Sequence, residues 1–287
     1  MRAVVPILTV LCVIIAVWYA GAVWMNRVWV YDQAARAGET VTFSQVIGQT
    51  LSQERPVLPA PHQVAVELFK STLGMAVTSK RSLVYHGWVT LSATLLGFAI
   101  GTAAGILLAV GIVHNRAMDM SVMPWAIASQ TIPILAIAPM IIVVLNSMGV
   151  TGLIPKAIIS AYLSFFPVVV GMVKGLRSPD GMQLDLLRTY SASKAETFWK
   201  LRLASSTPYL FTSLKVGVAA SLIGTIVGEL PTGAVAGLGA RLLSGSYYGQ
   251  TVQIWAALFA AALVAASLVA IIGVVERVTL RRMGMGR

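Results

Sequence analysis

The run WVTLSATLLGFAIGTAAGILLAVGIV, residues 88–113, decides the fold class, because no charged side chain interrupts it. About 20 helical residues are enough to cross the hydrocarbon core of a bilayer. The run is continuously apolar and does not alternate, which favours a helix over a strand of a membrane barrel. We therefore predict a membrane-spanning helix here.

Similar apolar runs recur along the chain and predict an all-α, polytopic membrane protein with six transmembrane helices. Of the 287 residues, 57% are hydrophobic and only 11% are charged, whereas about 25% of a soluble domain is charged. Too little polar surface remains to cover a water-soluble globule. The expected spans are Val4–Met25, Trp88–Val113, Val122–Leu145, Leu153–Val173, Tyr209–Leu230 and Val252–Val275.

The formal net charge of +11 is explained by membrane topology. With the N-terminus inside, most bases fall in inside segments, as the positive-inside rule requires. The short outside loops then hold only Lys156 and Arg241, and we expect both termini to be cytoplasmic. A charge of this size can also signal nucleic-acid binding, but here we expect the lipid bilayer as partner and no nucleic acid. The inside bases are Arg2, Arg116, Lys174, Arg177, Arg188, Lys194, Lys200, Arg202, Arg277, Arg281, Arg282 and Arg287.

The spans and the charges divide the chain into three parts. Residues 1–85 hold the first span and a long outer loop, in which His62–Leu73 is expected to form a short interfacial helix. Residues 86–276 form the transmembrane core, and residues 277–287 a basic cytoplasmic tail. Ala20-Gly-Ala22 resembles a signal-peptide cleavage site, but the apolar run is longer than a signal core, so we expect a retained helix.

The sequence carries no pattern typical of catalysis. Its single cysteine, Cys12, excludes a disulfide within the chain and a cysteine metal cluster. No Gly-x4-Gly-Lys-Ser/Thr loop for nucleotide phosphates is present, and the three histidines are scattered. We therefore expect neither enzymatic activity nor a metal site nor a cofactor bound by this chain.

Two groups of polar residues interrupt the apolar spans. Prolines 124, 133 and 139 fall in the third span, where each interior proline removes a helical hydrogen bond. A polar side chain at membrane depth is costly without a partner. Either interhelical hydrogen bonds or the lining of a translocation path explains these groups. They comprise Ser129, Gln130 and Thr131 before Pro133, and Ser221 and Thr225 in the fifth span.

Small residues recur at every fourth position of the second span. Gly97, Gly101 and Gly105 share one helical face, and glycines in this pattern let two membrane helices approach closely. We predict tight helix packing along this face.

The polar stretch between the fourth and fifth spans resembles the signature of the inner-membrane permeases of ABC importers. That signature runs Glu-Ala-Ala, three residues, Gly, nine residues, then Ile-x-Leu-Pro. Asp185-Leu186-Leu187 stands at its first position, Ser191 with Ala192 at the glycine, and Leu201-Arg-Leu203-Ala at its end. The spacing matches without a gap, although Ser191 replaces the glycine and Ala204 the proline.

Further motifs resemble the nitrate, sulfonate, taurine and thiamine-precursor branch of these permeases. The resemblance covers roughly residues 58–280. These motifs are Leu58–Pro61, Ile132–Pro139, Phe166-Pro167, Gly228-Glu229-Leu230 and Gly237-Leu-Gly239.

The resemblance implies a six-helix type I permease in a bacterial inner membrane. It implies a homodimer with the path at its two-fold axis, an ABC ATPase dimer that binds ATP and Mg²⁺ on the cytoplasmic side, and a periplasmic substrate-binding protein. Two short helices around a small-residue turn would dock on the ATPase, with Asp185, Leu186, Leu187, Ser191, Ala192, Leu201 and Leu203 forming the coupling loop. The stretch of residues 228–249 favours a pyrimidine or a thiamine precursor as the solute.

Two other functions remain open from the residues alone. An ion-coupled secondary transporter would need a gradient and no ATPase, although such carriers more often bury a carboxylate or break helices in matched repeats. A membrane anchor or assembly protein would show no substrate-dependent phenotype.

Overall fold

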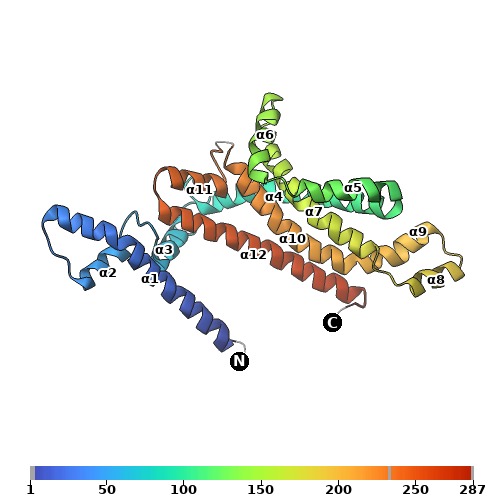
Figure 1. Ribbon diagram of the computed structural model, residues 1–287, viewed down its shortest axis with the longest axis horizontal. Coiled ribbons are helices and arrows are strands. Elements are labelled where there is room, and N and C mark those ends of the chain that lie inside the picture. Colours follow the sequence, from blue (N-terminus) through green and yellow to red (C-terminus); the bar gives the residue numbers. More distant parts are fainter. Residues whose placement is uncertain (1–3, 232–233, 286–287) are drawn as a thin grey trace. The chain divides into compact units, whose positions relative to one another are not determined.

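The computed structural model describes residues 4–231 and 234–285, and every regular element in them is helical. Two of the bases used in the topology argument, Arg2 and Arg287, lie outside the described residues. The helices, shown in Figure 1, are α1 (Val4–Ala37), α2 (Phe43–Leu51), α3 (Pro61–Thr72), α4 (Leu83–His114), α5 (Arg116–Ser129), α6 (Ile134–Ser147), α7 (Leu153–Leu176), α8 (Gly181–Thr189), α9 (Lys194–Glu196), the π-helix η1 (Thr197–Arg202), α10 (Leu203–Glu229), α11 (Leu238–Tyr247) and α12 (Thr251–Arg282).

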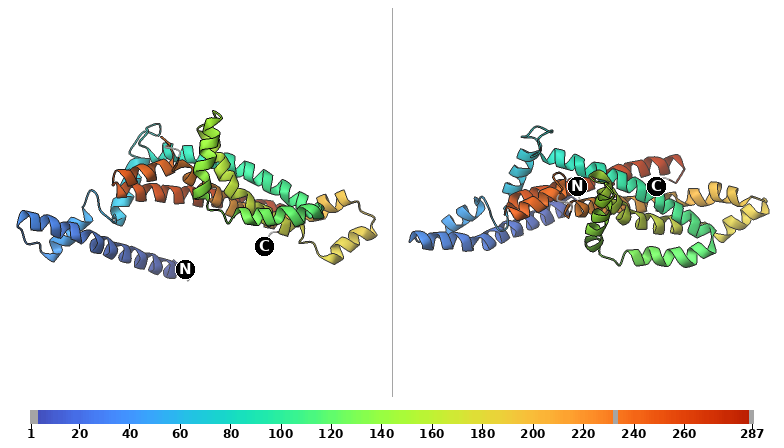
Figure 2. Two further views of the ribbon diagram at one scale, coloured as in Figure 1. Left: turned by 45° about the horizontal axis from the view of Figure 1, so that its top comes forward. Right: turned by 90° about the horizontal axis from the view of Figure 1, so that it is seen from above.

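Five helices are long and apolar enough to cross a membrane: α1, α4, α7, the continuous helix Lys194–Glu229, and α12. The expected third span, Val122–Leu145, is not one continuous helix. It consists of α5 and α6, which are bent by 99° at a short break and diverge in both views of Figure 2. The predicted six spans are reached when this pair counts as one.

The break has a local cause at Pro133. This proline is the N-cap of α6 with extended backbone (φ −62°, ψ 122°), and a proline restricts the preceding residue away from the helical region. Pro124 and Pro139, by contrast, lie inside α5 and α6. Only Pro133 among these three lies at a helix boundary.

The chain divides into two compact units, each with its own packing. The first comprises Met1–His86 and Arg241–Ala261, and the second Gly87–Ala240 and Ala262–Arg287.

In the first unit, α1 is held by the segment that follows α2. The buried Asn26 side chain donates to the Leu58 carbonyl (2.8 Å) and accepts from the Val57 amide (2.8 Å). The Trp18 indole donates to the Pro59 carbonyl at 3.0 Å. The predicted short helix His62–Leu73 is present as α3, and its position at the membrane interface stays a prediction. The sequence analysis missed α2.

The second unit is built on α4, α7 and α10. The glycine face of α4 packs against α7, as predicted: a Cβ on Gly97 would lie 2.5 Å from the Ala157 carbonyl oxygen, and one on Gly101 2.2 Å from Ser164 Oγ. Side chains there would force the helices apart. Lys156 was counted with the outside loops although it falls in the expected span Leu153–Val173; it lies in the first turn of α7 and is 7% exposed.

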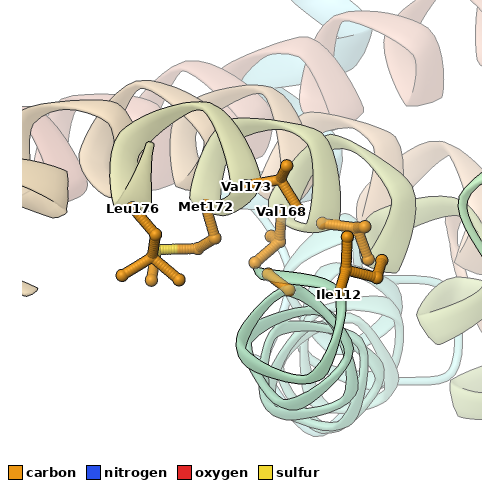
Figure 3. Close-up of a cluster of buried hydrophobic side chains, with 7 residues drawn as sticks. Ile112, Val168, Met172, Val173 and Leu176 are labelled. Atoms are coloured by element: carbon orange, nitrogen blue, oxygen red, sulfur yellow. The ribbon is translucent and has the colours of Figure 1, made fainter. Parts of the chain in front are cut away.

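A hydrophobic cluster of buried side chains joins α4 to the C-terminal half of α7. Ile112 of α4 meets Val168, Met172, Val173 and Leu176 of α7, as Figure 3 shows. These side chains are 0–5% exposed, so the ends of α4 and α7 form one body by apolar burial.

Candidate functional site

The residues after α7 form what we call the docking segment, Gly181–Leu203. It consists of α8, a turn at residues 190–193, the short helix α9 and the π-helix η1. In Figure 1, α8 and α9 lie together at the end of α7 and α10. It contains all the residues that the resemblance assigns to the coupling loop.

The turn after α8 is a Schellman motif with Ser191 at its centre. The Ala192 amide donates to the Leu187 carbonyl (3.0 Å) and the Ser191 amide to the Arg188 carbonyl (2.9 Å), the two bonds that define this C-cap. Ser191 has φ +55°, and it is the one non-glycine residue in the described chain with positive φ. Serine thus takes here the left-handed conformation for which glycine is the usual residue.

The second half of the docking segment differs from the expected pair of short helices. Ser193 caps α9: its hydroxyl accepts from the Glu196 amide (3.2 Å), and its own amide donates to the Glu196 carboxylate (3.0 Å). From there η1 continues directly into α10, so Lys194–Glu229 is one helix of 36 residues. The expectation of a separate second helix is wrong, because no glycine or proline ends α9.

This continuity ties the docking segment to the hydrophobic cluster. Phe198 and Leu203 pack on the cluster, and the Arg202 guanidinium donates to the Leu176 carbonyl at the end of α7 (2.9 Å). Leu201 is half-buried. Displacement of η1 would therefore move α10 and the end of α7 with it.

The opposite side of the docking segment is exposed and apolar. Met182, Leu186 and Tyr190 recur at every fourth position from α8 to its C-cap and are 80%, 57% and 77% exposed. Asp185 pairs with Arg188 at 2.9 Å on the surface. An exposed apolar row rimmed by charges is typical of a protein contact.

Of the predicted path residues, Ser129, Gln130 and Thr131 lie at the break between α5 and α6. Thr131 is exposed, and Ser129 and Gln130 are half-buried. Among the described residues, the side-chain amide of Gln130 forms a hydrogen bond only with the adjacent Ser129 hydroxyl (3.3 Å). The Tyr162 hydroxyl donates to the Ser129 carbonyl, where the helix ends.

The other two predicted path residues, Ser221 and Thr225, are fully buried between helices. Thr94 donates to Thr225 (3.0 Å), the Ser221 hydroxyl donates to the Thr94 carbonyl (3.0 Å), and Ser160 donates to the Ser221 carbonyl (2.9 Å). We call these four residues the polar seam. It joins α4, α7 and α10, in accord with the interhelical alternative.

The sequence analysis missed a buried charged cluster at the end of α10. Glu229, named above only as part of the Gly228-Glu229-Leu230 motif, is 0% exposed, and its carboxylate lies 3.4 Å from the Lys156 ammonium. Thr90 donates to its carboxylate at 3.0 Å, and the Gly239 amide at 2.8 Å. A lysine in the first turn of an apolar helix was the one available signal.

Comparison with known proteins identifies the family. Residues 101–285 match the family model described as binding-protein-dependent transport system inner membrane component. The chain belongs to this family of ABC importer permeases. The match covers the docking segment, the polar seam and the Glu229 cluster apart from Thr90 and Thr94.

Three relatives show the range of named solutes. The permease is 31% identical over 183 residues to the formylaminopyrimidine transport permease protein ThiX of Halalkalibacterium halodurans, covering 64% of this chain and 68% of ThiX. It is 29% identical to the riboflavin transport system permease protein RibX of Chloroflexus aurantiacus, covering 78% and 80%. It is 25% identical to the nitrate import permease protein NrtB of a Synechocystis strain, covering 66% and 69%. The protein is thus a multi-pass inner-membrane permease subunit of this branch.

Proposed function

We propose that the permease docks through Gly181–Leu203 onto a separate cytoplasmic ABC ATPase dimer, which binds and hydrolyses ATP with Mg²⁺. The observation that carries this proposal is the Ser191 turn, which presents the exposed row of Met182, Leu186 and Tyr190 while η1 runs into the core. The permease itself catalyses no covalent step. Its part is to convert movement of the docking segment into movement of α10.

We also propose that two copies of the chain form the path at a two-fold axis and receive the solute from a periplasmic binding protein. The family description names such a dependence on a binding protein. In this arrangement Ser129, Gln130 and Thr131 face the path, since an interrupted helix at membrane depth is tolerated where it lines a cavity. Ser221 and Thr225 would support the path wall from behind.

The proposed solute is a small heterocyclic compound, such as a pyrimidine or thiamine precursor. Two of the relatives are named for ring compounds, a formylaminopyrimidine and riboflavin. The charged residues Lys156 and Glu229 pair with each other, as do Lys215 and Glu276, so they offer no free charge to an oxyanion. Nitrate, the solute in the name of NrtB, is the competing class.

Reconstitution tests these proposals together. The permease is placed in proteoliposomes with its ATPase and binding-protein partners, and uptake of labelled formylaminopyrimidine, riboflavin and nitrate is measured. We expect ATP-dependent uptake of a ring compound. Uptake driven by an ion gradient without the ATPase would contradict the proposal, and ATP-dependent uptake of nitrate alone would contradict the solute class.

Thiol labelling tests the proposed topology, in which both termini are cytoplasmic. Ser193 and Ser246 are both exposed and should lie on opposite sides. In a variant without Cys12, Ser193→Cys should react with an impermeant reagent only after the cells are opened, and Ser246→Cys in intact cells. Reaction of Ser193→Cys from outside would overturn this orientation.

A further inference from the structure

The Glu229 cluster fastens the start of α11, with the residues just before it, to α4, α7 and α10. Lys156 of α7 donates to the Ala236 carbonyl at 3.1 Å. Thr90 of α4 accepts from the Leu238 amide at 2.8 Å, and Glu229 of α10 accepts from the Gly239 amide at 2.8 Å. The segment Ala236–Gly239 is therefore held by its backbone, through one polar side chain from each helix.

The loop approaches the carboxylate so closely that only glycine fits. Gly237 has φ +132°, and a Cβ there would lie 2.1–2.4 Å from the carboxyl atoms of Glu229. A Cβ on Gly239 would lie 2.4 Å from the Ile226 carbonyl oxygen. The backbone at Gly237 and Gly239 therefore covers the Glu229 carboxylate, and movement of this segment away from α10 would expose it.

A static joint would not need these charges. Burying an ion pair costs desolvation that the mutual attraction often fails to repay, and apolar residues of the same volume are frequently as stable. The polar seam shows that the same three helices are also joined through uncharged hydroxyls. The charges occur where helices end: Glu229 is the last residue of α10 and Lys156 is in the first turn of α7.

Position at the helix ends makes the fastening reversible. Breaking the side-chain-to-backbone bonds of Ala236–Gly239 removes no bond of a helical ladder. Leu238 and Gly239 are the first two residues of α11, and their amides have no partner within that helix. Charges released at a membrane surface are hydrated by water, whereas charges released at membrane depth are not. In the proposed topology this cluster lies at the outer surface, so its released charges would be hydrated there, whereas release deeper in the bundle would be prohibitive.

We propose that Lys156, Thr90 and Glu229 form a reversible clasp on Ala236–Gly239, and that this segment opens at the outer face of the permease during transport. The proposal rests on the proposed function and topology for its side of the membrane and its timing. Glu229 acts in it as a positioning residue. Its role is to hold the loop backbone, and it need not touch the solute.

The rate at which a thiol at position 238 reacts with a reagent from water measures opening of the clasp. The Leu238 side chain is 0% exposed, so it becomes reactive only when the segment moves. In a Cys12→Ser background, Leu238→Cys should react slowly with a water-soluble thiol reagent in the nucleotide-free transporter. Adding Glu229→Gln, which keeps the shape but removes the charge, should raise the rate about tenfold, the effect of losing one charge-assisted hydrogen bond. Lys156→Met should act in the same direction.

Matched variants separate opening from general loosening. Val235→Cys, 87% exposed, should react in every state, and Leu222→Cys, 3% exposed, in none. Ser221→Ala removes bonds of the polar seam but should leave the reactivity of Leu238→Cys unchanged. Ala240→Cys, at an 8% exposed position, repeats the measurement without removing side-chain volume.

The assembled transporter supplies the second readout. During ATP turnover with the binding protein present, reactivity of Leu238→Cys should rise in the otherwise wild-type chain. Unchanged labelling in Glu229→Gln overturns the clasp. Increased labelling in Glu229→Gln with no change during turnover overturns the transport role, because the fastening is then static. If the assembly shows no ATP-driven uptake at all, the proposed function fails, while the Glu229→Gln comparison on the permease alone still decides the clasp.

Discussion

Phe198 of the docking segment packs edge-on against His114 at the end of α4, with ring centroids 5.1 Å apart and an interplanar angle of 69°. Phe198 also contacts the hydrophobic cluster of α4 and α7. Its neighbour Trp199 faces outward and is 66% exposed. Two adjacent aromatic residues therefore face the hydrophobic cluster and the surface of the docking segment, respectively.

This contrast predicts different effects for the two aromatic residues. Phe198→Ala should leave ATPase binding intact but lower uptake per ATP hydrolysed, because the link from η1 to the core loses about 2 kcal/mol of packing, roughly half the cost at a fully buried phenylalanine. Trp199→Ala should instead weaken ATPase binding. Co-purification and the ratio of uptake to hydrolysis distinguish them, and identical effects of both changes would contradict the assignment.

The turn at Ser191 should become more stable when glycine replaces the serine. Ser191→Gly should raise stability by up to about 1 kcal/mol, because the left-handed conformation costs about 1–2 kcal/mol for a residue with a Cβ. Ser191→Val should lower stability by a similar amount. Ser191→Trp should block ATPase association or uncouple hydrolysis while the permease still reaches the membrane. Thermal unfolding and co-purification check these outcomes, and normal transport by Ser191→Trp would argue against this segment as the docking site.

A side chain at Gly101 should lower stability by disturbing the contact between α4 and α7. A Cβ there would lie 2.2 Å from Ser164 Oγ and 2.8 Å from the Ala161 carbonyl oxygen, so Gly101→Ala should cost about 1–3 kcal/mol by overpacking. Gly87→Ala is the matched control, because nothing lies within 4 Å of the added Cβ. Thermal unfolding in detergent measures both, and equal melting temperatures for the two variants would refute the close contact.

Substitutions at Gln130 and Ser221 should have opposite effects: one on solute selectivity, the other on stability. Gln130 has no interhelical bond in the described residues, so Gln130→Leu should change solute choice or uptake rate with little loss of stability. Ser221→Ala removes the hydroxyl bonds to the Thr94 carbonyl on α4 and to the Ser160 hydroxyl on α7 and should cost about 0.6–2 kcal/mol without changing selectivity. Competition between two solutes, measured beside melting temperature, tests both. A destabilised Gln130→Leu with unchanged selectivity would remove Gln130 from the path.

The sequence alone determined the features that depend on short stretches of chain. Continuous hydropathy over about 20 residues predicts a span wherever the run occurs, because the bilayer core has a fixed thickness. The glycine face of Gly97, Gly101 and Gly105 follows from helical periodicity. The position of the turn at Ser191 follows from motif spacing. Each of these three features depends on a single short stretch of sequence.

Tertiary structure alone decided which residues meet across elements. Lys156 and Glu229 are 73 positions apart, and no local pattern shows that this lysine pairs with that acid. Hydropathy also treats Val122–Leu145 as one run, whereas the backbone at Pro133 bends it by 99°. Whether a hydroxyl such as Ser221 faces a neighbouring helix or a path depends on the rotation of each helix in the bundle. That rotation is set by the packing of small residues on α4, α7 and α10, which no single segment contains.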